Sequence, residues 1–320
     1  MSASTEELAP APAAPKPPPV KAIRKSFSTP WASLVVVIIT VLWTIPTLGL
    51  FVSSLRPAAD VASSGWWTFF NHPSVTLDNY QQVLLGGGYN TSGGLATYFV
   101  NSLVISIPGS LFPLAIATMA AYCLAWVKFR GSDILFFTIF ALQVVPLQMA
   151  LIPLLRLYTG GLTIGAATVL PSLNGLNNGG WAFGRIWFSH TMFALPLAIF
   201  LLHNFMSQLP KDLMEAATMD GANHFVTFRK VVLPLALPAI ASFAIFQFLW
   251  VWNDLLVALT FGRTTTAPLT VRLEQLSGSL GSHLELLTAG AFVSIIVPLI
   301  VFFSLQRYFV RGLLAGSVKG

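Results

Sequence analysis

Charged residues are scarce in this sequence. Only 9% of its 320 residues are Asp, Glu, Lys or Arg, whereas soluble domains contain about 25%. Hydrophobic residues make up 55% of the chain, and the mean hydropathy is +0.75. A water-exposed surface needs more charge than this, so the composition excludes an ordinary soluble domain and predicts an integral membrane protein.

The residues that build enzyme and metal sites are also few or badly spaced. Cys123 is the single cysteine and lies in an apolar run, which excludes a disulfide framework and a cysteine metal site. The five histidines are scattered, without a pair at metal-ligand spacing. No glycine is followed by lysine, so the phosphate-binding loop G-x-x-x-x-G-K-[ST] is absent. We therefore expect no catalytic, metal or cofactor site in this chain, and a membrane-embedded enzyme has no candidate residues.

Long apolar stretches are what the sequence has instead. Residues 1–29, rich in Pro and Ala, precede them and predict a disordered cytoplasmic tail. The sequence predicts an all-α membrane protein with a six-span domain at residues 30–310 and a C-terminal cytoplasmic tail at residues 311–320. Each of the six stretches matches the roughly 20 residues that a helix needs to cross a bilayer. They are Trp31–Val52, Tyr98–Trp126, Ile134–Leu155, Trp187–Phe205, Leu237–Phe261 and Leu286–Leu305.

Lys and Arg are unevenly distributed among the segments that join these stretches. With the N-terminus inside, twelve of the 17 basic residues lie in cytoplasmic segments and five in outer segments. The positive-inside rule then places both termini in the cytoplasm. If the short apolar segment Leu162–Leu173 crossed the membrane, every later loop would lie on the opposite side. We therefore expect this segment to be re-entrant or to lie on the outer surface. The basic residues form no aromatic-interleaved patch, so no nucleic-acid partner is expected.

The most polar internal stretch, MEAATMDGANHFVTFRKVVLPLALP, falls in a predicted cytoplasmic loop. Pro210 can start a helix, and we expect that helix over Lys211–Asp220. Gly221 permits the backbone angle that ends or bends it. A second short helix is expected through ANHFVTFRKVV, until Leu233 and Pro234 redirect the chain to the bilayer. The alternative is an amphipathic loop that lies on the lipid headgroups.

This stretch resembles the EAA loop of bacterial ABC importer permeases. The match consists of EAA, three residues, glycine, nine residues, valine, one residue, leucine and proline. In that family the loop is a coupling helix that docks into a cleft of the ATP-binding subunit. The resemblance implies the same role for the coupling loop at residues 207–236, carried by Glu215, Ala216, Ala217, Asp220, Gly221 and Pro234.

Other stretches narrow the resemblance to carbohydrate permeases similar to the smaller, six-span subunit of the maltose/maltodextrin transporter. They are NSLVISI, AAYCLAWVKFRG, FALPLAIFLLHNFMSQLPKDLMEAA, FLWVWNDLLVAL and QRYFVRGLLAGSVKG. The likeness covers residues 30–320 and implies a type I ABC importer permease fold in the bacterial plasma membrane. The chain departs from the group in its proline-rich N-terminal tail and in a longer, Gly/Asn-rich connection at Leu173–Ile186.

The resemblance also implies a function and partners. The chain would be the non-catalytic permease subunit of an ATP-driven importer of maltose/maltodextrin, trehalose or another α-glucoside. Its implied partners are a second homologous permease, a dimer of ATP-binding subunits that hold ATP and Mg, an extracytoplasmic sugar-binding protein and the lipid bilayer. The alternative is a self-sufficient transporter or channel driven by an ion gradient, which would need acids in mid-span, and only Asp254 falls in a predicted span.

Two further groups of residues have more than one interpretation. In the maltose-type group the C-terminal tail reaches into the ATPase dimer, whereas composition alone favours a frayed end here. The tail residues that the resemblance implicates are Gly316, Val318 and Lys319. In the fifth stretch, Trp252, Asn253 and Asp254 either border the translocation path or brace a helix contact, and tryptophan is also common as an interfacial anchor. Prolines within the predicted spans free backbone carbonyls, for bending during transport or for static packing.

Overall fold

A computed structural model describes the protein over residues 30–86, 94–127, 129–277 and 283–317, with side chains as far as residue 306. The chain divides into two compact units, residues 1–50 and 51–320. The described part of the first unit, residues 30–50, is entirely helical. The predicted tail at residues 1–29 lies outside the described residues, so its disorder stays a prediction.

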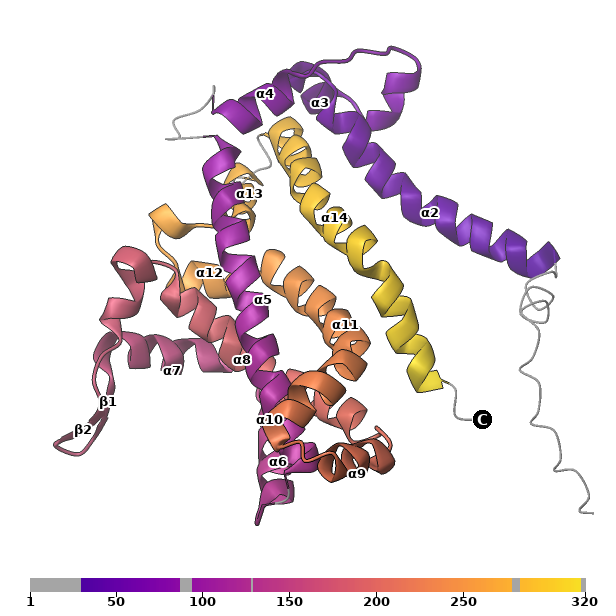
Figure 1. Ribbon diagram of the computed structural model, residues 1–320. Helices are drawn as coiled ribbons and strands as arrows, with labels where there is room; N and C mark the ends of the chain where they lie inside the picture. Colours follow the sequence, from indigo (N-terminus) through magenta and orange to yellow (C-terminus); the bar gives the residue numbers. More distant parts are fainter. Residues whose placement is uncertain (1–29, 87–93, 128, 278–282, 318–320) are drawn as a thin grey trace, which may run out of the picture. The chain divides into compact units, whose positions relative to one another are not determined.

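Helices make up most of the described chain (Figure 1). The long ones are α2 (Pro30–Ser54), α5 (Leu95–Trp126), α8 (Gly184–Met206), α11 (Leu233–Trp252) and α14 (Leu284–Ser317). The short ones are α3 (Ala58–Ser63), α4 (Asp78–Leu85), α6 (Ser132–Ala141), α7 (Leu147–Gly160), α9 (Lys211–Met219), α10 (His224–Thr227), α12 (Leu256–Phe261) and α13 (Leu269–Ser277). The remaining elements are 3-10 turns η1 (Trp66–Phe70), η2 (Leu142–Val144), η3 (Asn174–Asn177), η4 (Gly179–Trp181) and η6 (Thr264–Thr266), the π-helical turn η5 (Phe228–Val232), and strands β1 (Leu162–Ile164) and β2 (Ala167–Leu170).

The described residues contain five helical segments that are long and apolar enough to cross a membrane. Four predicted spans, the first, second, fourth and sixth, fall inside such segments and are confirmed as apolar helices. The fifth is confirmed with different ends. The five segments are Pro30–Ser54, Leu95–Trp126, Gly179–Met206, His224–Trp252 and Leu284–Gln306.

The third predicted span, Ile134–Leu155, is wrong as a continuous helix. The chain there forms two helical pieces, Ser132–Val144 and Leu147–Gly160, with an angle of 102° between them. Val145 between them has an extended backbone, with ψ of 117°. Proline disfavours the helical conformation of the residue before it, so Pro146 accounts for the break. The pair counts as a sixth span only if the two pieces together cross the bilayer.

The fifth predicted span, Leu237–Phe261, is also wrong at both ends. The helical segment starts earlier, at His224, and stops at Trp252. After three residues without helical structure of their own, the short helix α12 continues to Phe261. A side-chain cap accounts for this break, because Asp254 accepts hydrogen bonds from the backbone of α12 and so starts a new helix there.

The segment Leu162–Leu173, expected to be re-entrant or to lie on the surface, contains an antiparallel β-hairpin. β1 pairs with β2, and Gly165 in the turn has a left-handed φ of +62°. Its residues are exposed in this chain on both strands. The segment therefore does not cross as a helix, as expected, but the all-α prediction is wrong at this point. The β-branched residues Thr, Ile and Val favour the extended backbone.

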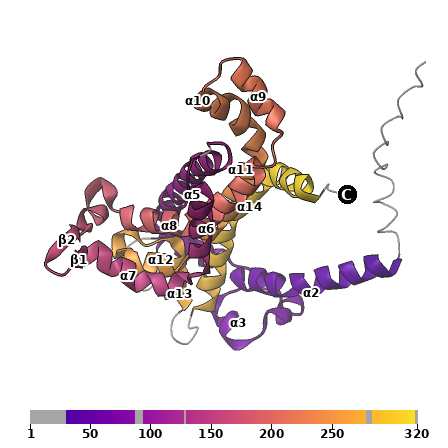
Figure 2. The same cartoon turned by 90° about the horizontal axis from the view of Figure 1, so that it is seen from below.

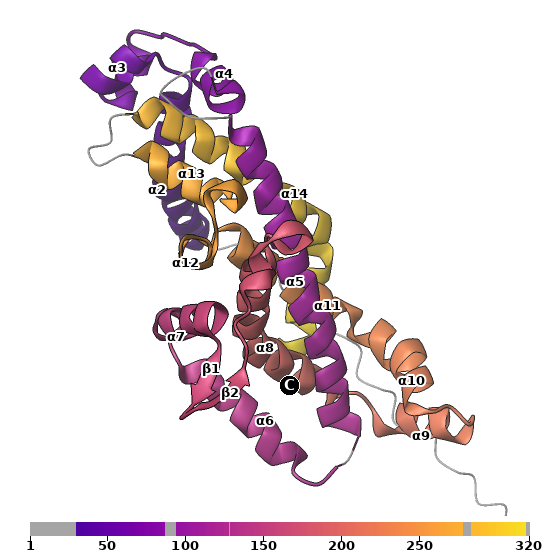
Figure 3. The same ribbon diagram turned by 90° about the vertical axis from the view of Figure 1, so that its left-hand side faces the viewer.

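In the second unit, α5 packs along α8 and α11, and α11 packs along α14 (Figures 1 and 3). Alanines with no exposed surface, among them Ala117, Ala121 and Ala198, let α5 and α8 approach closely. At Gly109 of α5 a Cβ atom would lie 3.2 Å from Val251 Cγ1. The absence of a side chain there permits the close crossing of α5 and α11.

Two prolines inside α5 leave backbone carbonyls without a helical donor, because proline has no N–H to offer the residue four positions earlier. In both cases a side chain of a neighbouring helix donates instead. One donor belongs to α8 and the other to α11, so the two hydrogen bonds join α5 to both of these helices. The hydrogen bonds run from Trp187 Nε1 to the Val104 carbonyl (2.9 Å), four residues before Pro108, and from Gln247 Nε2 to the Gly109 carbonyl (3.2 Å), four residues before Pro113.

The same arrangement joins α11 to α14. Pro298 lies inside α14, and the carbonyl of Ser294, four residues earlier, accepts a hydrogen bond from Trp252 Nε1 at 3.1 Å. Trp252 is only 3% exposed, and its ring stacks on Phe248 at 5.8 Å. Of the roles predicted for Trp252, the structure supports the brace of a helix contact. At these three sites the carbonyls that the prolines free accept hydrogen bonds from neighbouring helices.

The pairing between Gln247 and Pro113 can be tested by a double-mutant cycle. Gln247→Met removes the donor but keeps the length of the side chain. We expect the free energy of unfolding in detergent to fall by about 1 kcal/mol, because a buried carbonyl loses its partner. Pro113→Ala supplies a backbone N–H, so Gln247→Met should cost less in that background.

Thermal unfolding of the four proteins measures the coupling energy. Gln208→Met is the matched control, because Gln208 is exposed and bonds only within its own segment. The same cost in both backgrounds would contradict the assigned role of Gln247.

Candidate functional site

The predicted coupling loop is built around helix α9. The helix begins at Lys211 directly after Pro210 and ends at Met219, so the predicted helix Lys211–Asp220 is confirmed to within one residue. Ala217 is the buried residue of α9. The other coupling residues are exposed: Glu215, Ala216, Asp220, Gly221 and Pro234.

A fixed turn follows α9. Gly221 has a left-handed φ of +78°, which favours glycine, and its amide donates to the Thr218 carbonyl at 2.9 Å. Two residues later, Asn223 Oδ1 accepts a hydrogen bond from the Val226 amide at 2.9 Å and caps α10. The predicted role of Gly221 in ending the helix is thereby confirmed. Local hydrogen bonds fix the angle between α9 and α10.

The chain does not turn at Leu233 and Pro234, and that prediction is wrong. α10, the π-helical turn and α11 form one helical segment from His224 to Trp252. In the π-helical turn the Leu233 amide donates to the Phe228 carbonyl, five residues earlier. This widened turn accommodates Pro234, whose ring would otherwise clash with the preceding turn. The change of direction occurs at residues 220–223 instead.

The start of α10 is attached to α5. Tyr122 of α5 places its hydroxyl 3.1 Å from His224 Nδ1 and donates to the His224 carbonyl at 3.2 Å. The Tyr122 ring also contacts the Phe228 ring at 5.1 Å. A groove of about 580 Å³ lies beside this contact, between the end of α5 and α9. The groove is lined by Tyr122, Trp126, Met214, Glu215, Thr218, Met219, Ala222, Asn223, His224 and Thr227.

Large apolar side chains are exposed on α9 and α10, which lie beyond the ends of α5 and α11 (Figures 2 and 3). Met219 is 88% exposed and Phe225 is 69% exposed. Such residues beside acidic Glu215 and Asp220 on a rigid turn are typical of a surface that another protein covers. In the chain, α9 and α10 lie between the long helices α8 and α11.

A second feature is a cavity of about 730 Å³ at the two breaks in the long helices. The break at Val145 and Pro146 forms one wall, and the end of α11 forms another. Of the predicted path residues, Asn253 and Asp254 line the cavity, whereas Trp252 does not. Its full lining is Leu142, Gln143, Val145, Pro146, Leu147, Gln148, Ala150, Met192, Phe193, Pro196, Trp250, Asn253, Asp254, Leu255 and Leu256.

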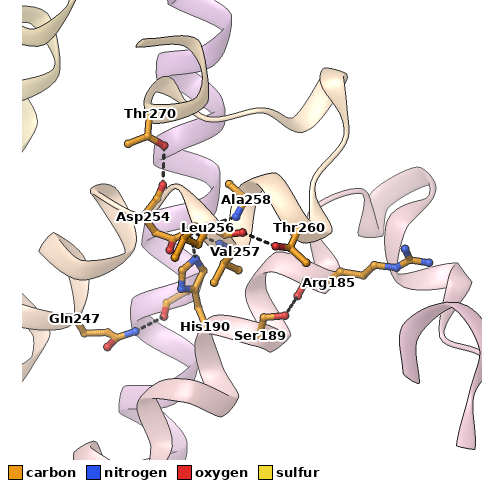
Figure 4. A network of polar contacts seen from close by, with 11 residues as sticks. Arg185, Ser189, His190, Gln247, Asp254, Leu256, Val257, Ala258, Thr260 and Thr270 are labelled. Atoms are coloured by element: carbon orange, nitrogen blue, oxygen red, sulfur yellow. Dashed lines mark hydrogen bonds and ion pairs between the residues drawn. The ribbon is translucent and has the colours of Figure 1, made fainter. Parts of the chain in front are cut away.

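Asp254 lies at the centre of a polar network beside this cavity (Figure 4). Its Oδ2 atom accepts from the amides of Val257 at 3.0 Å and Ala258 at 3.2 Å, which caps α12. Its carbonyl accepts from Thr270 Oγ1 at 2.6 Å. His190 Nε2 of α8 lies 3.8 Å from the same carboxylate oxygen. Asp254 therefore both borders the cavity and holds a helix end.

Several polar residues of this region were missed by sequence reasoning. Gln143 and Gln148 line the cavity, and His190 and Gln247 lie in a smaller adjoining pocket. In the sequence the three glutamines are single polar residues inside apolar stretches, whereas His190 lies between Ser189 and Thr191. Only the presence of polar residues within apolar stretches could have singled them out. Asn253 is exposed and donates to the Leu249 carbonyl at the end of its own helix.

The predicted tail contacts Gly316, Val318 and Lys319 lie outside the residues whose side chains the structure describes. Their role stays a prediction. Within the described ranges, no group of three or more His, Cys, Asp and Glu residues could hold a metal ion. What the described residues offer is a partly polar cavity and an exposed helix followed by a fixed turn.

Comparison with known proteins gives the family. Residues 113–314 match the family described as binding-protein-dependent transport system inner membrane component. The chain belongs to this family, and it is a multi-pass permease component of the inner membrane.

Two relatives and one solved structure are similar over most of the chain. The osmoprotective compounds uptake permease protein GgtD of Synechocystis sp. is 51% identical over 292 residues, which cover 89% of this chain and 91% of that protein. The alpha-glucoside transport system permease protein AglG of Rhizobium meliloti is 50% identical over 257 residues, which cover 80% of this chain and 63% of that protein. A crystal structure of a bacterial ABC transporter involved in the import of the acidic polysaccharide alginate has a similar fold, with a TM-score of 0.67, 21% identity and coverage of 92% of this chain and 100% of that one.

The cap that Asp254 provides predicts different effects for two substitutions. Asp254→Ala removes the acceptor for two backbone amides, and we expect the free energy of unfolding to fall by about 1 kcal/mol. Asp254→Asn keeps a side-chain oxygen, so its loss should be clearly smaller. Thermal unfolding of the purified protein in detergent measures both, with exposed Asp220→Ala as the control. An equal loss for the two Asp254 variants would contradict the capping role.

Proposed function

We propose that the chain is the permease subunit of an ATP-driven carbohydrate importer, with maltose/maltodextrin, trehalose or another α-glucoside as substrate. Two observations support this class of substrate: a relative with 50% identity is named for alpha-glucoside transport, and the cavity at the helix breaks suits a neutral polyhydroxyl compound. Amide side chains of Gln143, Gln148 and Asn253 offer donors and acceptors, and Trp250 offers an aromatic face. The charge of Asp254 is already engaged by backbone amides.

The energy for transport enters, in this proposal, through α9. The sequence has no phosphate-binding loop, so ATP and Mg are assigned to separate ATP-binding subunits. The observation that carries the proposal is the geometry of the α9 turn. It exposes Glu215, Asp220 and Met219, while Tyr122 fastens the next helix to α5. A docked ATP-binding subunit could therefore move α5 and α11 together with α9.

The topology follows from the same proposal. With the bent pair α6 and α7 as one span, the chain has six spans and both termini in the cytoplasm. The α9 turn then lies in the cytoplasm, and the connections at residues 161–183 and 262–283 lie outside. An outer sugar-binding protein is the proposed source of substrate, in line with the family description of binding-protein-dependent transport. A second, homologous permease completes the membrane part.

The proposal predicts that Glu215→Lys uncouples transport from ATP hydrolysis. Charge reversal at a docking contact weakens binding by about 1.4 kcal/mol or more, which corresponds to about tenfold. In proteoliposomes with all partner subunits, both uptake and the ATPase stimulation by loaded binding protein should fall at least by that factor, while membrane insertion is unchanged.

Glu274→Lys is the matched control, since Glu274 is also exposed but lies on α13, and it should retain wild-type coupling. Normal ATPase stimulation by the Glu215→Lys protein would contradict the coupling role. Transport without any ATP-binding subunit would instead favour the ion-gradient alternative.

A further inference from the structure

A cluster of aromatic side chains occupies the connection between α2 and α4. In the sequence WWTFF, residues 66–70, four of five side chains are aromatic. We call the 3-10 turn formed by these five residues the aromatic turn. Trp67 is 64% exposed and Phe70 is 65% exposed. Neighbouring rings contact one another edge to face, as Trp66 does with Phe70 at 6.3 Å. The exposed rings therefore form one continuous apolar surface.

The aromatic turn is held in place by a buried arginine. Arg56 is 3% exposed, and its terminal nitrogens donate to backbone carbonyls and hydroxyl groups of the residues that precede and enter the turn. These hydrogen bonds hold the chain around the guanidinium group and so fix the positions of the aromatic rings. The acceptors are the carbonyls of Asp60, Ser64 and Gly65 and the hydroxyls of Ser64 and Thr68.

The base of the aromatic turn lies at the ends of long helices. Asn79 at the start of α4 donates to the Ser54 carbonyl at 2.9 Å and to the Arg56 carbonyl at 2.8 Å, and so ties α4 to the last residue of α2. Val83 of α4 belongs to one buried cluster with residues from the first turns of α5 and α14, Leu95 and Leu286. Ends of membrane-crossing helices lie near the boundary between acyl chains and water.

The chain on both sides of the aromatic turn carries little charge. Residues 61–77 include no Asp, Glu, Lys or Arg. A protein-docking surface normally has a polar rim around its apolar centre, whereas the lipid headgroup boundary favours aromatic residues at the ends of spans. We propose that the aromatic turn inserts into the headgroup boundary of the lipid bilayer and anchors this end of the helices. The proposal rests on the membership of a membrane-component family and not on the identity of the transported substrate.

Spin-label accessibility tests this proposal on the full chain. A nitroxide on Phe70→Cys, in a Cys123→Ser background, is compared in vesicles of phosphatidylethanolamine and phosphatidylglycerol. Oxygen, which dissolves in lipid, and a water-soluble nickel chelate are the two relaxing agents. The oxygen-to-nickel accessibility ratio at position 70 should be severalfold higher than at Ser63→Cys, an exposed position on α3.

Two results would overturn the proposal. One is a ratio at position 70 equal to that at Ser63→Cys, which would place the aromatic turn in water. The other is nickel access at position 70 that disappears only when a solute-binding protein is added, which would make the turn a protein-docking surface. Trp67→Cys provides a second label position on the same turn if the Phe70→Cys protein does not fold, and the same ratios decide the outcome there.

Discussion

A backbone carbonyl inside a bilayer finds no water, so every carbonyl that a proline frees there needs a donor from the protein. Three of the hydrogen bonds between helices of the second unit satisfy this requirement. Each of three prolines in α5 and α14 is matched by one side-chain donor on a neighbouring helix. The donors Trp187, Gln247 and Trp252 form these contacts at 2.9, 3.2 and 3.1 Å. The helices are therefore joined through backbone atoms as well as through packed apolar side chains.

α5 connects the two candidate functional regions. Its first half carries the freed carbonyls that α8 and α11 bind, close to the cavity at the helix breaks. Its second half carries Tyr122, which holds the start of α10, and Trp126, whose indole donates to the Met206 carbonyl at the end of α8. Under the proposed function, a displacement of α9 reaches the cavity by two routes. One is the continuous segment from α10 to α11, and the other is α5.

Features that depend on local sequence could be predicted, and features that depend on distant partners could not. The apolar helices follow from the length of the stretches, and the end of α9 follows from the φ that Gly221 allows. Whether a proline breaks a helix depends on its surroundings. Pro108 and Pro113 remain inside α5, because side chains of other helices supply the missing donors. Pro146, in contrast, follows the end of one helix and precedes the next. The position of Glu215 on an exposed helix was predictable from its motif. The cavity was not, because its lining comes from helices far apart in the sequence.

Cysteine cross-linking measures directly whether α9 is the contact through which ATP-binding subunits act. Met219→Cys places a thiol at a position of α9 that is 88% exposed, in a Cys123→Ser background that removes the native cysteine. With the assembled transporter and a short reagent that carries one maleimide and one photoreactive diazirine, we expect a covalent product with the ATP-binding subunit after irradiation, whereas Ser63→Cys on α3 gives none. Full reactivity of Met219→Cys toward a water-soluble maleimide in the assembled transporter, with no cross-linked product, would contradict the account.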